Sequence, residues 1–253
     1  MAEEKILSLS RLVKSGQILA SCLNISRQML KSGFTSLQIN DEMEKFMISN
    51  QSTPSFRGLH NYPFASCISF NEQIVHALPC DRKMEKGDIV TVDVGVSFQG
   101  NCTDAARTYL FGGNKKQIDL VSTAYEALKA GISSCIENNT VGDISYSIQR
   151  VIELNKYRTP IELGGHGVGL EPHTDPFIPN YGVPKTGMKL VYGMVLAIEP
   201  IVMEKGNSII LDTDGFSIKS KNNCMSSHVE DTIIVTNSLP RILTSISLDG
   251  TPA

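Results

Sequence analysis

An aspartate stands in the middle of an apolar stretch of this sequence, where a charge is costly. In IVTVDVGV, residues 89–96, every second residue is a valine and Asp93 lies between two of them. Since the side chains of a strand point alternately to its two faces, the valines are expected on one face and Asp93 on the other. A carboxylate buried in such a strand requires a charged partner or a metal ion. Asp93 is therefore the first candidate metal ligand.

A second aspartate follows eleven residues later. Asp104 lies in CTDAARTYLF, and the intervening Gln99–Gly100–Asn101 is typical of a turn, so the two segments predict an antiparallel hairpin. Pairing about that turn brings Asp93 and Asp104 within a few positions of register. Two carboxylates this close repel each other unless they share a proton or a cation. The alternative is an ion pair with Arg107 and an ordinary turn aspartate.

The second half of the chain adds three more residues of metal-ligand type. His166 lies in GGHGVG, where the neighbouring glycines let backbone or ligand approach closely. Glu199 ends the apolar stretch VLAIE, and Glu230 lies in the apolar stretch VEDTIIV. Four carboxylates and one imidazole suit a pair of divalent cations bridged by carboxylates, as in two-metal hydrolases. The same set disfavours copper and iron–sulfur clusters.

Helices and strands in a repeated order are expected to position these residues. Apolar periodicity predicts a helix over 8–31, and the capping box of Thr35 and Gln38 begins a second helix that runs to about Ile48. Further helices are expected over 116–136 and from Gly142 to about residue 155. Strands are expected over residues 65–70, 89–98, 102–111, 190–203, 208–212 and 229–236.

This order, two helices and then strands in each half, predicts the α+β class. Two similar halves would have helices covering one side of antiparallel sheet. Low-complexity linkers are absent from the sequence, so residues 1–253 are expected to form a single catalytic domain.

Composition and charge narrow the class of protein further. The net charge of −3 does not favour nucleic acid or an anionic membrane as a partner. The sequence has neither an apolar run of about 20 residues that could span a bilayer nor a secretion signal at its start. Its six cysteines contain no CxxC pair and are expected to be reduced thiols. A cytoplasmic enzyme fits these properties best.

The sequence resembles type I methionine aminopeptidases, which have the compact pita-bread fold, over nearly its whole length. The motifs that carry the resemblance are, in chain order, NEQIVHALP, VDVGVSFQGNCTDAARTYLFG, GGHGVG, VLAIEPIV and VEDTIIVT. The resemblance implies that Asp104 and Glu230 bridge two divalent cations, which would be cobalt, manganese, iron or zinc. Asp93 would complete one cation site, and His166 and Glu199 would complete the other.

The same resemblance implies three catalytic roles. His76 would contact the substrate near its amino end, and His173 would hydrogen-bond the scissile amide and its transition state. Glu199 would move a proton to the departing amine, as general base and then as general acid. The substrates would be the N-termini of peptides or nascent polypeptides, and the protein would be a monomer. Charge clusters such as Lys115–Lys116 are interpreted as solvated turns, with a ribosome-facing role as the alternative.

The pocket for the first side chain departs from the usual bacterial pattern. Aromatic, apolar and sulfur-containing residues are expected to line it beside His76 and His173: Phe56, Leu59, Tyr62, Cys67 and Phe216. Phe216 stands where the family often has tryptophan, and Phe56 and Leu59 stand where cysteine and tyrosine are usual. Pro172 and Thr174 flank His173, in place of an aromatic residue and a glutamate. These replacements could alter the preference for methionine, which is nevertheless the expected first residue.

Two rival functions and two histidines remain open from the sequence. A proline-directed aminopeptidase or dipeptidase would use the same metal chemistry, but such enzymes usually carry an extra N-terminal domain, for which 253 residues leave no room. A non-catalytic binding module of the same fold would be expected to have lost ligands, whereas all five are retained. His228 should face the same side of its strand as Glu230, as a structural or a substrate-contacting residue. His60 is a further candidate for the wall of the cleft.

Overall fold

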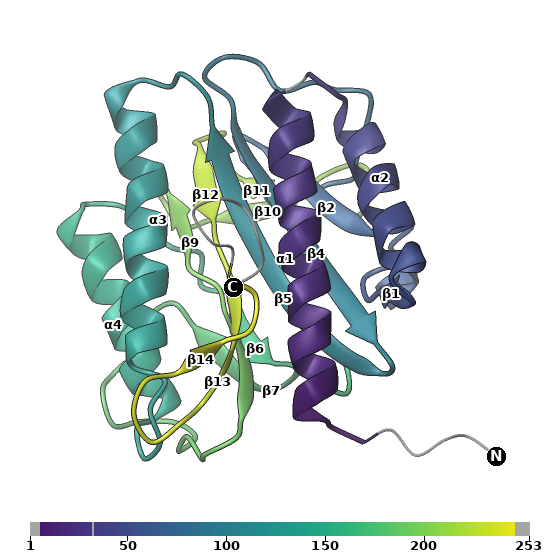
Figure 1. The fold of residues 1–253 in the computed structure, drawn as a ribbon. Coiled ribbons are helices and arrows are strands. Elements are labelled where there is room, and N and C mark those ends of the chain that lie inside the picture. Colours follow the sequence, from purple (N-terminus) through teal and green to yellow (C-terminus); the bar gives the residue numbers. More distant parts are fainter. Residues whose placement is uncertain (1–5, 32, 246–253) are drawn as a thin grey trace.

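Four helices lie on one side of the strands in the computed structural model, which describes residues 6–31 and 33–245 (Figure 1). Each half begins with a helix pair and continues with strands. The helices are α1 (Leu9–Lys31), α2 (Ser36–Ser49), α3 (Lys115–Ser133) and α4 (Val141–Leu154). This arrangement confirms the α+β class, and the helix bounds agree with the predicted ones to within about three residues.

The predicted capping box at the start of α2 is present. The Thr35 side chain accepts from the backbone N–H of Gln38, and the Gln38 side chain accepts from the backbone N–H of Thr35. Ile39, Met43 and Met47 follow at helical spacing and are fully buried. They belong to a core in which α1 and α2 pack against the valine face of the strand at residues 89–98. The valines are thus turned to the helices, and Asp93 to the opposite side.

A hairpin holds the two aspartates at a fixed offset. It is formed by β4 (Ile89–Phe98) and β5 (Asn101–Leu110), whose two-residue turn has positive φ at Gln99 (49°) and Gly100 (75°). Positive φ at both positions is the geometry of a type I′ turn, which matches the twist of the flanking strands. Asp93 lies opposite Ala106 and Asp104 opposite Gly95, so the two acids are offset by two positions.

The remaining strands form short antiparallel ladders. Beside β4 and β5 lie β1 (Ser52–Pro54) and β2 (Ser66–Phe70), and a short 3₁₀ helix covers Leu59–Asn61. A three-stranded sheet holds β10 (Ile209–Leu211), β11 (Ile218–Ser220) and β3 (Gln73–Val75). A five-stranded sheet holds, in spatial order, β14 (Arg241–Ile242), β13 (Asp231–Ile234), β8 (Val195–Ile198), β6 (Gly164–Gly167) and β7 (Thr174–Pro179).

The predicted strand over 190–203 is wrong in its extent. Residues 190–194 lie outside any strand, and Glu199–Pro200 separates β8 from β9 (Ile201–Met203). Proline has no backbone N–H for a ladder, which accounts for the break. The predicted strand over 229–236 is shorter in the structure, where it is represented by β13, which pairs with β8; β12 (Ser226–His228), which pairs with β9, lies before the predicted range.

A seam of hydrogen bonds, between residues 104–108 and residues 228–232, joins the two halves. Ala106 and Glu230 exchange backbone hydrogen bonds of 3.3 and 2.9 Å. On one side of this pair the Thr232 hydroxyl binds the backbone N–H and C=O of Asp104. On the other side the Thr108 hydroxyl binds the backbone C=O and N–H of His228. The seam therefore fixes Asp104 of the first half beside Glu230 of the second.

The cysteines and the hydropathy of the helices agree with the composition of the sequence. All six cysteines lie among the described residues and none forms a disulfide bond, as expected. Among the described residues, every helix is too short or too polar to span a bilayer.

Candidate active site

All five predicted metal ligands line one cavity of about 500 Å³. They form two triads, and in each triad one ligand atom from every residue lies within 4.8 Å of the ligand atoms of the other two. One triad is Asp93, Asp104 and Glu230, and the other is His166, Glu199 and Glu230. Glu230 belongs to both, so the two triads are adjacent and share a carboxylate.

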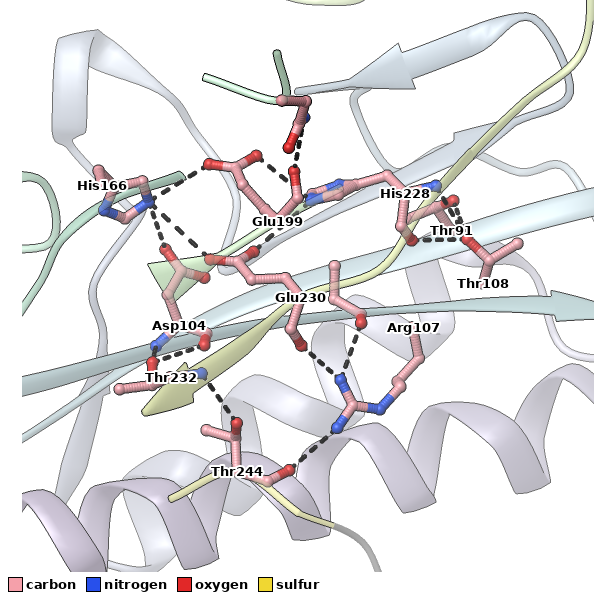
Figure 2. Close-up of polar contacts among 12 residues, drawn as sticks. Thr91, Asp104, Arg107, Thr108, His166, Glu199, His228, Glu230, Thr232 and Thr244 are labelled. Carbon is pink, nitrogen blue, oxygen red and sulfur yellow. Dashed lines mark hydrogen bonds and ion pairs between the residues drawn. The ribbon is translucent and has the colours of Figure 1, made fainter. Parts of the chain in front are cut away.

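The His166 ring is surrounded by three carboxylates. Its Nε2 atom lies 3.6 Å from Glu199 Oε1, 3.9 Å from Glu230 Oε1 and 4.0 Å from Asp104 Oδ2 (Figure 2). Donor atoms that share one ion at about 2.1 Å lie roughly 3–4 Å apart. These separations fit a common cation better than direct hydrogen bonds.

The orientation of His166 supports the same conclusion. Its Nδ1 atom lies 3.0 Å from the carbonyl oxygen of Gly167, and a carbonyl can only accept, so Nδ1 carries the proton. In a neutral ring, Nε2 then presents a lone pair to the carboxylates, as a metal-ligating histidine does. The positions on either side of His166 require glycine because there is no room for a Cβ atom. A Cβ at Gly165 would collide with the carbonyl oxygen of Ala197, and one at Gly167 with that of Asp175.

Three carboxylate oxygens of the cluster have no hydrogen-bond partner among the described residues. Asp93 Oδ1, Asp104 Oδ1 and Glu230 Oε1 are buried and accept no hydrogen bond from a described residue. Burial raises the pKa of Asp93 to about 7, and the charge of Glu199 adds to the effect. Burial and neighbouring acids also raise the pKa values of Asp104 and Glu230. Crowded carboxylates with unused oxygen lone pairs are what a site for divalent cations requires, so these residues fit metal ions.

Neither hairpin acid forms the alternative ion pair with Arg107. The Arg107 guanidinium lies 2.6 Å from Asp231 Oδ1 and also donates to the carbonyl oxygens of Ala106, Glu230 and Thr244. Arg107 therefore supports the backbone of Glu230 and leaves the carboxylates of the cavity unneutralised.

Replacement of Arg107 by alanine is expected to lower the free energy of unfolding by about 3–5 kcal/mol, because it leaves the Asp231 carboxylate buried without its partner. The two side chains are only 11% and 10% exposed. Urea denaturation of Arg107→Ala measures the loss. Arg57→Ala is a matched control, since Arg57 is 46% exposed in its pair with Glu44 and should cost at most about 1 kcal/mol. Equal losses in the two variants would contradict the prediction.

Two further predicted histidines lie beside the cluster. His76 directly follows β3 with a positive φ of 59°, and His173 directly precedes β7; both line the cavity. The His173 ring lies 4.3 Å from the His166 ring, edge to face. Burial lowers the pKa of His76, and burial together with His166 lowers the pKa of His173 to about 4. Both rings are therefore neutral at pH 7, and each offers one N–H donor and one acceptor.

An apolar wall closes the cavity next to Asp93. It is formed by the residues that the sequence placed in the pocket: Phe56, Leu59, Tyr62, Cys67 and Phe216. The Tyr62 hydroxyl donates to the carbonyl oxygens of Ser66 and Ala77, both at 3.0 Å, and its ring packs edge to face on Phe216. Cys67 is paired with Asp93 across β2 and β4. Burial, with the charge of Asp93, raises the pKa of the Cys67 thiol, so it stays protonated.

The cavity is also lined by two histidines whose role the sequence did not decide and by residues that the sequence did not predict there. His60 is exposed at its edge, and His228 is only 2% exposed and lies against Glu199 and Glu230, on the side that strand alternation predicts. Further lining residues were not predicted: Val75, Glu162, Leu163, Gly164, Phe177, Leu211, Gly215 and Ile218. Val75 and Gly164 lie within the NEQIVHALP and GGHGVG motifs, whereas the others come from short strands and loops outside the quoted motifs.

Comparisons with known proteins agree with this geometry. A model of metallopeptidase family M24 matches residues 10–237. The methionine aminopeptidase of Clostridium perfringens is 36% identical over 234 residues, which are 92% of this chain and 94% of the relative. The crystal structure of methionine aminopeptidase from Thermotoga maritima superposes with a TM-score of 0.89 at 33% identity, covering 95% of this chain and all of that one.

A more distant structural match identifies the fold alone. Prolidase from Pyrococcus horikoshii has a TM-score of 0.76 at 23% identity, covering 96% of this chain and 64% of the prolidase chain. Both structural matches confirm the pita-bread fold that the sequence motifs implied. The family model spans most of the sequence, including all five predicted metal ligands, and the chain therefore belongs to metallopeptidase family M24.

Proposed function

We propose that this chain is a metal-dependent aminopeptidase that removes N-terminal methionine from polypeptides. The observation that carries the proposal is the pair of ligand triads sharing Glu230, next to an apolar pocket in the same cavity. Relatives named methionine aminopeptidase, 31–36% identical over more than nine tenths of the chain, support the choice of substrate.

The ligand set would hold two divalent cations. Asp104 and Glu230 would bridge them, Asp93 would complete one site, and His166 and Glu199 would complete the other. When bound, such cations lower the pKa of water and polarise the scissile carbonyl. The carboxylate-rich set suits cobalt, manganese, iron or zinc, and we propose that the ions come from this group.

The protein's own groups would perform the rest of the reaction. Glu199 would take the proton of the attacking water and deliver it to the departing amine. His173 would donate a hydrogen bond to the scissile carbonyl oxygen as negative charge develops there. His76 would contact the substrate near its amino end. Neutral rings suit both histidines to these roles, since a neutral imidazole can donate one hydrogen bond.

The apolar wall would bind the first side chain of the substrate. Methionine is unbranched and apolar, and its sulfur contacts aromatic rings favourably. Phe56, Tyr62 and Phe216 provide such rings, and Leu59 and Cys67 complete the surface. Because the Tyr62 hydroxyl is held by two backbone carbonyls, the wall keeps its shape without substrate.

A peptide assay tests the proposal directly. With manganese or cobalt, the enzyme is expected to release methionine from Met-Ala-Ser and to leave peptides of the form Xaa-Pro-Ser intact. Preferential cleavage of the Xaa-Pro peptides would instead support a proline-directed enzyme. Cleavage of neither, together with no metal binding, would support the non-catalytic binding module.

The proposal also covers the domain organisation, the oligomeric state and the location of the enzyme. We propose that residues 1–253 form a single catalytic domain that acts as a monomer in the cytoplasm on peptide or nascent-polypeptide N-termini, near the ribosome in the latter case. Nucleic acid and membranes have no place in this function.

A further inference from the structure

His228 is a buried histidine of the cavity that the reaction described above does not use. It ends β12, two residues before Glu230, and its side chain is 2% exposed. Its Nε2 atom lies 3.4 Å from Glu199 Oε2 and 3.7 Å from Glu230 Oε2. Neither ring nitrogen forms a fully aligned hydrogen bond with a described residue. A buried imidazole with unused nitrogens facing a reactive cavity needs a partner there.

The two oxygens of Glu199 face two different imidazoles. Oε1 lies 3.6 Å from His166 Nε2, whereas Oε2 lies 3.4 Å from His228 Nε2. Figure 2 shows Glu199 and Glu230 between these two rings. His166 carries its proton on Nδ1, toward Gly167, so it has no N–H to offer Glu199 in its neutral form. Of the two rings, only His228 can donate to this carboxylate from Nε2.

Hydrogen bonds to Thr108 hold the backbone of His228 in place beside Glu199. The Thr108 hydroxyl donates to the His228 carbonyl at 2.6 Å and accepts from its backbone N–H at 3.1 Å. The Thr108 hydroxyl proton is donated to the His228 carbonyl. The 2.8 Å hydrogen bond between the hydroxyls of Thr91 and Thr108 must therefore be donated by Thr91. Glu199 is held in turn by Asn180, whose amide donates to its carbonyl oxygen at 3.0 Å.

We propose that His228 is a positioning residue for Glu199. Its Nε2–H donates to Glu199 Oε2 and thereby keeps Oε1 directed toward His166 and the shared cation site. The separation of 3.4 Å is slightly longer than an ordinary N–H···O hydrogen bond, and a small rotation of either side chain would bring the two atoms into that range. The proposal rests on the function given above. It assigns to His228 a role that packing alone would not require.

Two variants separate positioning from packing. His228→Gln keeps a side-chain N–H donor, whereas His228→Leu fills similar space without one. Loss of a hydrogen bond to a metal ligand typically costs 10–100-fold in metal affinity or activity. We expect His228→Leu to lose 10–100-fold in manganese affinity by calorimetry and in kcat, with little change in KM. We expect His228→Gln to stay within a few-fold of wild type. Wild-type affinity and kcat in a folded Leu variant would overturn the proposal.

A measurement on the wild-type protein tests the same contact even if the variants fail to fold. The proton positions of the histidine rings are read by NMR of ¹⁵N-histidine-labelled enzyme loaded with zinc. We expect His228 to carry a proton on Nε2 and His166 to carry its proton on Nδ1; an unprotonated Nε2 on His228 overturns the proposal. A wild-type enzyme that binds metal but cleaves no peptide would refute the proposed function, while the affinity and NMR results would still decide the role of His228.

Discussion

Asp104→Asn is expected to lose metal binding and peptide cleavage together. Asp104 belongs to a triad with Asp93 and Glu230 and also lies within reach of His166 and His173. The substitution keeps the shape but removes the charge and turns one ligand oxygen into an N–H group. Since loss of even an outer partner of a metal ligand costs 10–100-fold in affinity, loss of a shared ligand should exceed about 100-fold. Calorimetric titration with manganese and cleavage of Met-Ala-Ser measure the two effects.

Asp88→Asn provides the matched control for this variant. Asp88 is also a buried aspartate, 8% exposed, but it pairs with Arg82 outside the cavity. Its asparagine variant should bind manganese and cleave peptide normally, although weakening of its ion pair will reduce stability. Normal metal affinity in Asp104→Asn would show that the triads do not hold the cations.

His173→Ala should have the opposite pattern, with metal retained and turnover lost. The donor that His173 offers to the developing oxyanion is used in the transition state, so its removal should lower kcat by about 10²–10³-fold and change KM little. Steady-state kinetics with Met-Ala-Ser, at manganese concentrations that saturate both proteins, measure the effect.

The same variant tests a competing role for His173. Its ring nitrogen lies within ligand range of Asp104 and His166, so His173 could itself be a metal ligand. In that case His173→Ala would lose manganese affinity as Asp104→Asn does. An unchanged kcat would exclude both roles. His173→Gln, which keeps an N–H donor, should recover part of the lost turnover if hydrogen bonding is the role.

Local sequence patterns were sufficient to predict the first-half hairpin and its acids. The alternation of valines placed Asp93 on the face opposite the valines, which in the structure is the face away from the helices, and the turn after Phe98 brought Asp104 near it in register. These features depend on neighbours within about fifteen residues, which is the range over which periodicity and turn chemistry act. The capping box of α2 was readable for the same reason.

Features that depend on distant pairing could not be predicted in this way. Arg107 had two nearby acids in the sequence, but its partner in the structure is Asp231, 124 residues away. The division of the last strands between two ladders is likewise a property of the packed molecule, because strand pairing is decided by tertiary contacts. The convergence of His166, Glu199 and Glu230 on the hairpin was implied by resemblance to a family; periodicity alone did not establish it.

The seam between residues 104–108 and residues 228–232 determines when the metal-ligand cluster can form during synthesis of the protein. Contacts separated by 120 or more positions form late, and a domain made on the ribosome emerges from its N-terminus. A growing chain that has completed α4 possesses Asp93 and Asp104 but lacks the other three ligands of the cluster. Each new molecule therefore becomes a hydrolase only when its final strands have been synthesised and have formed their hydrogen bonds with β5.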